Sequence, residues 1–251
     1  MKKNKIFTVF FCLVFPFALF STNIPNCTIC GDNPIIDQIV YKLRDPKTDR
    51  EAFRFHLKKM GEYMGLEVAR HLHTKTKSIT TVLDEVAHHN FIDEDIVLIT
   101  IFRAGLPLYE AMQEVFPKAL SGFFGMKRLE NPNSCRKGAA PDSLPIELDY
   151  YSLPSLKDKC IIIADTMIAT SSSLLKAIKI NESFQPKRII VVGTIAAKDG
   201  LLRITEHNPK IKIFVGAVDP VLNHLGFIVP GLGDAGDRAY GMPIVKMHKT
   251  K

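Results

Sequence analysis

Short runs of apolar residues alternate along this chain with segments in which apolar residues recur at helical spacing. The runs predict strands at 96–102, 159–165, 188–196 and 211–218, and the spaced segments predict helices at 48–73, 78–88, 106–116, 172–183 and 201–207. Strands that are almost entirely apolar and alternate with helices are typical of a parallel sheet covered on both faces. We therefore predict an α/β fold with a mainly parallel sheet flanked by helices.

The beginning of the chain breaks this pattern. Lys2, Lys3 and Lys5 precede an apolar run at 6–20, which is the arrangement of a secretory signal. The run is short for a membrane span and is interrupted by Pro16. We divide the chain into an apolar, signal-like leader at 1–31 and one folded domain at 32–251. We expect the protein to stay in the cytoplasm; the alternative is export, if the leader works as a signal.

Composition narrows the class of partner. The chain has 251 residues, 46% of them hydrophobic and 24% charged, with a formal net charge of +7. This is the balance of a globular protein large enough to build its own core. The basic residues are scattered and not interleaved with aromatic ones, so we expect no nucleic-acid partner. A modest positive charge suits a phosphate-bearing small molecule.

The five cysteines indicate neither a disulfide framework nor a zinc site. Their number is odd, and the single C-x-x-C of Cys27 and Cys30 has no second pair to complete a tetrahedral site. Cys160 lies in an apolar run and is predicted to be a buried, inert thiol. An unpaired thiol in a core strand favours a reducing compartment.

Two segments carry the chemistry of the chain. At 161–173 an apolar strand ends in Asp165, and small and hydroxyl residues then open a helix, where backbone N–H groups can bind an anion. At 226–238 four glycines, two aspartates and an apolar run suit a backbone that approaches a flat ligand closely. From the residues alone, the first could equally be a helix cap and the second a turn-rich surface loop.

These segments resemble those of a known family. Residues 222–238 read L-N-H-L-G-F-I-V-P-G-L-G-D-A-G-D-R, and this run resembles the uracil-binding segment of uracil phosphoribosyltransferases. Residues 161–173 resemble the family's phosphoribosyl diphosphate loop. I-F-R-A-G-L at 101–106 and G-M-K-R-L-E at 125–130 resemble its diphosphate-binding segments. The resemblance extends over about 40–241.

The resemblance implies a type I phosphoribosyltransferase fold with a hood over the carboxyl ends of the strands. The implied reaction belongs to pyrimidine salvage: uracil N1 is joined to C1 of phosphoribosyl diphosphate, which yields uridine monophosphate and diphosphate. Mg²⁺ is implied as a cofactor that the diphosphate carries, with no metal ligand from the protein. The partners implied are these small molecules and a second copy of the chain in a homo-oligomer, with GTP as an effector to be tested and no stable membrane span.

Residue by residue, the resemblance assigns a site. The implied catalytic residues are Arg103, Asp165 and Asp234. The implied contacts to phosphoribosyl diphosphate are Arg103, Arg128, Asp165, Thr166, Met167, Ile168, Ala169, Thr170, Ser171, Ser172, Ser173 and Asp234. The implied contacts to uracil are Ile228, Gly233, Asp234 and Ala235. The segment at 131–150, which lies in a stretch dense in Pro, Gly, Ser and Asn, is expected to close over the site as a loop.

Three departures from the family pattern fall in the phosphoribosyl loop. Thr166 stands where the family has proline, and Ser171 and Ser172 stand for two glycines. If either serine needs a positive φ, the strain is on the order of 1–2 kcal/mol. Two alternatives therefore stay open: a non-catalytic or regulatory relative with a degenerate loop, or a phosphoribosyltransferase for another base.

Other matches are interpreted as structural. They comprise the segment at 196–200 and the stretch that holds Leu43, Arg44, Asp45, Thr48, Phe53 and Arg54. His88 and His89 are predicted at a helix end, where we expect them to be solvated.

Overall fold

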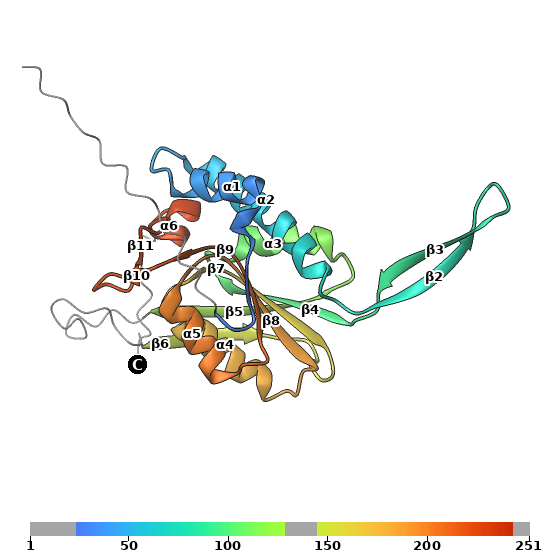
Figure 1. Ribbon diagram of the computed structural model, residues 1–251. Coiled ribbons are helices and arrows are strands. Elements are labelled where there is room, and N and C mark those ends of the chain that lie inside the picture. The colour runs from blue at the N-terminus through green and yellow to red at the C-terminus, as the bar shows by residue number, and fades with distance from the viewer. Residues whose placement is uncertain (1–23, 129–144, 243–251) are drawn as a thin grey trace, which may run out of the picture.

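The computed structural model describes residues 24–128 and 145–242 (Figure 1). Within these residues a seven-stranded sheet has the order β1-β9-β8-β7-β4-β5-β6, and neighbouring strands are parallel except β5 and β6. The strands are β1 (Cys27–Ile29), β4 (Ile96–Phe102), β5 (Leu120–Arg128), β6 (Ile146–Ser152), β7 (Cys160–Ile168), β8 (Arg188–Ala197) and β9 (Lys212–Asp219). The predicted fold class is confirmed.

Helices cover both faces of this sheet. One layer consists of α1 (Pro34–Arg44), α2 (Arg50–Ala69) and α3 (Leu106–Val115), and the other of α4 (Ser172–Glu182) and α5 (Lys198–His207). Successive side chains of β7 alternate between the layers: Ile162 and Ala164 pack toward the first, Ile161 and Ile163 toward the second. Because both faces are buried, these strands need apolar residues at every position, and this is why they were predictable.

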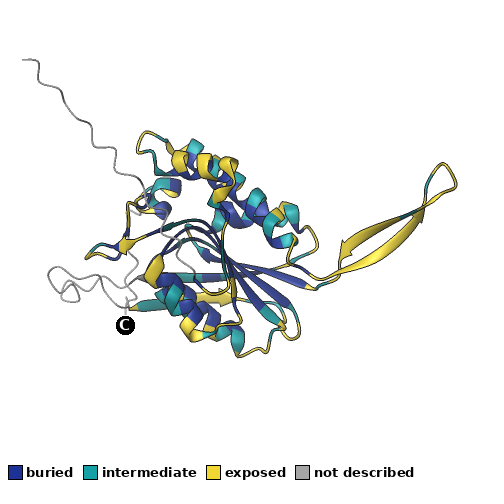
Figure 2. Cartoon of the chain, in the orientation of Figure 1, coloured by how far each residue is buried: buried dark blue, intermediate teal, exposed yellow. Residues whose placement is uncertain are grey.

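The predicted helix at 78–88 is wrong. The chain there forms an antiparallel hairpin of β2 (Thr74–Thr80) and β3 (Val86–Ile92), which projects from the body with nearly all its residues exposed (Figures 1 and 2). Its apolar residues recur at helical spacing, but β-branched residues favour strands, and Asp84, with φ 59°, reverses the chain. His88 and His89 therefore lie on an exposed strand and not at a helix end.

Two further differences concern the edges of the sheet. The segment predicted as a loop at 130–151 ends in β6, which pairs antiparallel with β5, whereas residues 129–144 lie outside the described residues. An edge strand pairs on one side only and needs no apolar run, so the pattern did not reveal it. At the other edge β1 pairs with β9, and Ile24 and Cys30 are buried. The sheet thus includes residues assigned to the leader at 1–31.

The segment after β9 forms the expected hood. It consists of the two-stranded β10 (Val221–Leu222) and β11 (Ile228–Val229) and of α6 (Ala235–Tyr240), whose Ala235 and Ala239 are fully buried in the layer of α2. Because it continues from the end of β9, the hood lies at the carboxyl ends of the parallel strands (Figure 1). The β2–β3 hairpin leads into the start of β4 and therefore lies at the opposite end.

Candidate active site

The phosphoribosyl loop connects β7 to α4 at the carboxyl edge of the sheet. Its residues line a small hollow, formed by Asp165, Met167, Ala169 and Thr170–Leu174. Arg203 of α5 supports the loop, because its Nη1 donates to the carbonyl oxygen of Thr170 over 3.2 Å. The helix α4 begins at Ser172, beside this hollow, and the first N–H groups of a helix are suited to bind an anion.

Ser171 and Ser172, the two serines that replace glycines, differ in their backbone. Ser171 has φ 61° and ψ 9°, a left-handed conformation that favours glycine. Its Oγ is buried and donates to the carbonyl oxygen of Gly200 over 2.8 Å. Ser172 is the first residue of α4 and has no positive φ. The strain foreseen for this loop is therefore confined to Ser171, whose hydroxyl is turned toward α5.

Thr166, the third departure, links two parts of the site. Its side chain is fully buried, and Oγ1 donates to the carbonyl oxygen of Ala104 over 2.6 Å. Ala104 follows Arg103 in the turn between β4 and α3. A proline at 166 could not make this bond, so the substitution adds a hydrogen bond between β7 and the turn that carries the arginine.

Arg103 connects that turn to the hood. Its Nη2 lies 2.9 Å from Asp237 Oδ1, and its Nη1 donates to the carbonyl oxygen of Gly241 over 3.1 Å. The side chain keeps 45% of its surface exposed. The guanidinium thus faces oxygen acceptors of the kind that a diphosphate would also offer.

Asp234 lies close to the same guanidinium. It is exposed and caps α6, accepting the N–H of Asp237 over 2.9 Å. A Cβ added to Gly236 would lie 3.3 Å from Asp234 Oδ1 and 3.5 Å from Arg103 Nη2. The fold therefore brings Arg103 and Asp234 together across 131 residues of sequence. Asp165 precedes Thr166, whose hydroxyl bonds to Ala104 beside Arg103.

The segment expected to bind uracil is a compact turn. Ile228 and Ala235 are buried, Gly233 is exposed, and both Gly231 (φ +62°) and Gly233 (φ +80°) have backbone conformations that L-residues rarely adopt. A Cβ at Gly231 would come within 2.0 Å of the carbonyl oxygen of Ile228. The glycine density of the sequence is thus required by the turn itself, and the turn leaves the backbone of Gly233 at the surface of the site.

A larger hollow of about 620 Å³ lies at the amino ends of β4 and β7 and is lined by residues that include Glu94, Lys118, Cys160 and Lys187. Ligands of parallel α/β sheets bind outside the carboxyl ends of the strands. We therefore place the candidate site at the smaller hollow beneath the hood.

The described thiols do not contribute chemistry to the site. Burial raises the pKa of Cys160 to about 11 and those of Cys27 and Cys30 to about 12, so that all three stay protonated at neutral pH. Within 24–128 and 145–242 no group of three or more His, Cys, Asp or Glu residues is placed to hold a metal.

Comparison with known proteins decides the family. The family model for uracil phosphoribosyltransferase matches residues 30–242. The chain is 40% identical over 216 residues to the uracil phosphoribosyltransferase of Thermococcus gammatolerans, covering 85% of this chain and 92% of that protein. It is 41% identical to the one of Thermococcus kodakarensis, with 85% and 90% covered. The chain belongs to the uracil phosphoribosyltransferase family. Its resemblance to this family, identified from the sequence, is confirmed.

A solved structure agrees with this assignment. The AQ2163 protein from Aquifex aeolicus superposes with a TM-score of 0.76 at 34% identity, covering 87% of this chain and all of that one. The strand-Asp-loop, the Arg103 turn and the glycine-rich hood therefore belong to one family fold. In the described part of this family member, no helix is long and apolar enough to span a membrane.

Two expected parts of the family site fall wholly or partly outside the description. Arg128 is the last residue of β5, opposite Ile146 of β6, but its side chain lies outside the described residues. The same holds for 131–144 of the expected closing loop. The proposed roles of both stay predictions.

Sequence reasoning missed the arginines that attach the hood. Arg238, the last residue of the family segment, donates to the carbonyl oxygens of Leu232 (2.9 Å), Asp45 (2.7 Å) and Leu43, and its guanidinium lies 4.2 Å from the centre of the Phe53 ring. Burial lowers its pKa. Arg54 of α2 donates to the carbonyl oxygen of Ala239 over 2.8 Å. Both arginines lie in segments that match the family pattern. Their contacts could not be predicted, because the partners are too distant in the sequence.

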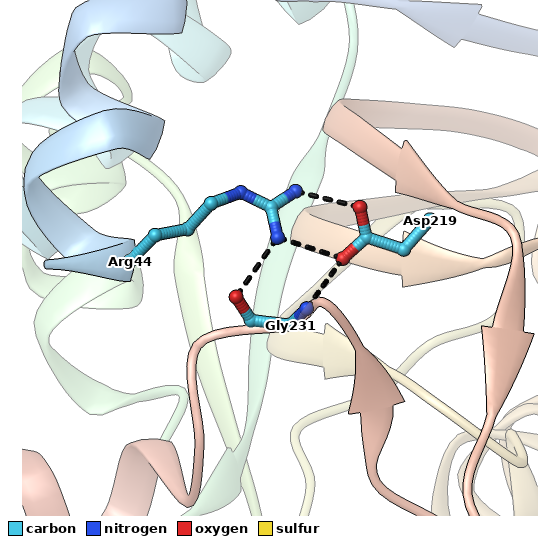
Figure 3. A network of polar contacts seen from close by, with 3 residues as sticks. All are labelled: Arg44, Asp219 and Gly231. Atoms are coloured by element: carbon cyan, nitrogen blue, oxygen red, sulfur yellow. Dashed lines mark hydrogen bonds and ion pairs between the residues drawn. The ribbon is translucent and has the colours of Figure 1, made fainter. Parts of the chain in front are cut away.

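Arg44 was also interpreted as structural. Arg44 is the last residue of α1, and its guanidinium forms a bidentate ion pair with Asp219 at the end of β9 (2.7 and 2.8 Å). The guanidinium also donates to the carbonyl oxygen of Gly231 (Figure 3). The network fastens the turn of the hood to both the first helix and the last strand of the sheet.

Proposed function

We propose that this chain is an active uracil phosphoribosyltransferase, which transfers the phosphoribosyl group of phosphoribosyl diphosphate to N1 of uracil. The observation that carries the proposal is the meeting of Arg103 with the Asp234 segment beneath the hood. Family membership supports it, and no observation favours a different base or a non-catalytic relative.

In this proposal the loop after β7 holds the ribose 5-phosphate. Backbone N–H groups from Thr166 to Ser173 and the hydroxyls of Thr170, Ser172 and Ser173 surround the phosphate, and Asp165 accepts hydrogen bonds from the ribose hydroxyls. The hydroxyls of Thr166 and Ser171 have other partners, the carbonyl oxygens of Ala104 and Gly200. Diphosphate departs with negative charge as C1 becomes cationic, and Arg103 and Arg128 stabilise the leaving group. We propose these roles for the side chains from their positions and from the family pattern.

Mg²⁺ enters as part of the second substrate, bound by diphosphate oxygens, which are the ligands that this hard cation prefers. The carboxylates of Asp165 and Asp234 are acidic groups of the site that fit such an ion, whereas Asp237 is paired with Arg103. Bound there, the ion would neutralise charge on the leaving group.

Uracil offers two carbonyl groups and an N–H edge. We propose that backbone groups of Ile228, Gly233 and Ala235 pair with these, with Asp234 facing the diphosphate and its metal. The loop at 131–150 would close over the site and keep water from the activated C1.

The decisive assay measures diphosphate release by the purified chain with uracil, cytosine, adenine or hypoxanthine as the acceptor. We expect release with uracil alone. Equal or better use of another base would overturn the assignment of the substrate. Absence of release with every base, together with retained binding of uridine monophosphate, would indicate the non-catalytic alternative.

Three finer proposals complete this function. We propose a homo-oligomer, supported by the exposed apolar tip of the β2–β3 hairpin.

We propose a cytoplasmic location, because phosphoribosyl diphosphate is made inside cells and the described thiols are free. Fractionation of the host tests it, and a processed form found outside the cytoplasm would contradict it. GTP as an effector rests on the family alone and is tested by the rate with and without GTP.

A further inference from the structure

The network of Arg44, Asp219 and Gly231 holds both backbone polar groups of one residue, Gly231, in place. Asp219 Oδ2 accepts the N–H of Gly231 over 2.9 Å, and Arg44 Nη1 donates to the carbonyl oxygen of Gly231 over 2.8 Å (Figure 3). The same Nη1 donates to Oδ2 of Asp219, and Nη2 donates to Oδ1 over 2.7 Å. The side chain of Asp219 is only 6% exposed. The guanidinium, the carboxylate and the N–H and C=O groups of Gly231 are therefore linked in one closed hydrogen-bond network.

Gly231 occupies the centre of the turn that matters for the base. Ile228 precedes it by three residues and Gly233 follows it by two. The turn is so tight that a Cβ at Gly231 would lie 2.0 Å from the carbonyl oxygen of Ile228. The network thus fixes the orientation of the two peptide units that flank Gly231, and with them the direction in which the neighbouring backbone groups point.

We propose that Arg44 and Asp219 are positioning residues for uracil. Neither is assigned to contact the base; together they set the backbone of 228–233 before uracil arrives. The inference rests on the proposed function of the site and adds the residues that determine its affinity for the base. Pre-organisation of this kind lowers the free energy that binding must spend on ordering the turn.

The chemistry of the pair makes it sensitive to conservative changes. A planar guanidinium can contact both carboxylate oxygens and the carbonyl at once, whereas a lysine ammonium on a flexible stem cannot reproduce this fork. Replacing Asp219 by Asn keeps the shape but removes the charge that holds the guanidinium. Since the carboxylate is buried, loss of either partner leaves a polar group without its match.

The test compares wild type with Arg44→Lys and Asp219→Asn in steady-state kinetics, varying uracil and phosphoribosyl diphosphate separately. We expect the KM for uracil to rise about tenfold or more, because a charge-assisted contact is lost. The KM for phosphoribosyl diphosphate should stay within about twofold, since the network holds the turn at Gly231 that is proposed to bind uracil. The double variant should have a KM for uracil no higher than that of the more affected single variant, because both substitutions break the same network.

Arg54→Gln is the matched control. Arg54 also donates to a carbonyl oxygen of the hood, but its acceptor is Ala239 in α6, away from the uracil turn. It should lower the melting temperature without the selective rise in the KM for uracil. Parallel rises in both KM values for the Arg44 and Asp219 variants would show that the network only stabilises the hood. An equal rise in the KM for uracil in Arg54→Gln would show the same, and either result would overturn the proposal.

A measurement on the wild-type chain covers the case in which the variants do not fold. The Gly231 amide should exchange its hydrogen slowly even without uracil, because it is buried against Asp219. Exchange at the rate of an exposed loop would show that the turn is not pre-set and would overturn the inference. A wild-type chain with no uracil-dependent activity would instead refute the proposed function.

Discussion

At position 171 a serine has a left-handed backbone conformation. Two effects of opposite sign on the stability act there, backbone strain and a side-chain hydrogen bond. The conformation costs on the order of 1–2 kcal/mol relative to glycine. The bond from Ser171 Oγ to the carbonyl oxygen of Gly200 contributes about 1 kcal/mol. The two nearly cancel, so the loop can tolerate a residue that the family pattern excludes.

This balance gives a prediction for two variants. Ser171→Gly should change the free energy of unfolding little, because it removes both the strain and the bond. Ser171→Ala keeps the strain and loses the bond, so it should lower stability by about 1 kcal/mol. Urea unfolding of both variants measures the difference. Equal stabilities would contradict the argument, and Ser172→Gly, at a position without positive φ, should bring no relief of strain.

Arg103 carries the prediction for catalysis. Arg103→Ala should lower kcat/KM at least about tenfold, since the contact to the leaving group is charge-assisted. Arg70→Ala is the control, because Arg70 is 76% exposed and pairs only weakly with Glu67 at 3.6 Å. An unchanged kcat/KM in the Arg103 variant would make this arginine a tether of the hood and nothing more.

At the scale of elements, the strand β1 lies within the segment predicted as a leader and pairs with β9. Removal of residues 1–31 deletes β1 and the buried Ile24 and Cys30, whereas removal of 1–23 leaves them in place. Burial of an isoleucine side chain contributes about 2 kcal/mol. We therefore expect the shorter chain to be less stable by about 2 kcal/mol or more, measured by urea unfolding. Identical midpoints for the two truncated chains would mean that β1 adds nothing to the sheet.

How much the sequence could predict depended on the kind of element. The strands β4, β7, β8 and β9 are buried on both faces, so continuous apolar runs marked them to within three residues at each end. The prediction that the strand ends in Asp165 was wrong, because β7 continues to Ile168. The hairpin β2–β3 has no buried face, and its spacing carried no reliable signal. The phosphoribosyl loop and the uracil turn were found through motifs. The pair of Arg44 and Asp219 was not, because a contact across 175 residues leaves no local pattern.

At the scale of the whole molecule, the site and the hairpin lie at opposite ends of the parallel strands (Figure 2). The tip of the hairpin presents Val82 and Leu83, which are 99% and 80% exposed. Exposed apolar side chains on a projecting arm are typical of a contact with another protein. The separation allows the arm to bind a second copy without covering the hood.

The oligomer can therefore be tested apart from the chemistry. Replacing Val82 and Leu83 together by Ser should shift the chain toward monomers in sedimentation equilibrium, while diphosphate release per chain at saturating substrates stays within about twofold. Leu66→Ser, an exposed apolar residue on α2, is the control and should leave the mass unchanged. A double variant with the mass of the wild type would exclude the arm as the contact.

The tie between the end of α1 and the turn at Gly231 also has a consequence during synthesis. Arg44 leaves the ribosome 175 residues before Asp219 and 187 before Gly231. While residues 174–227 are being added, the nascent chain already contains the proposed phosphoribosyl loop but lacks the proposed uracil segment. Premature termination within this interval therefore yields a product that keeps Arg103 and has no segment for the acceptor.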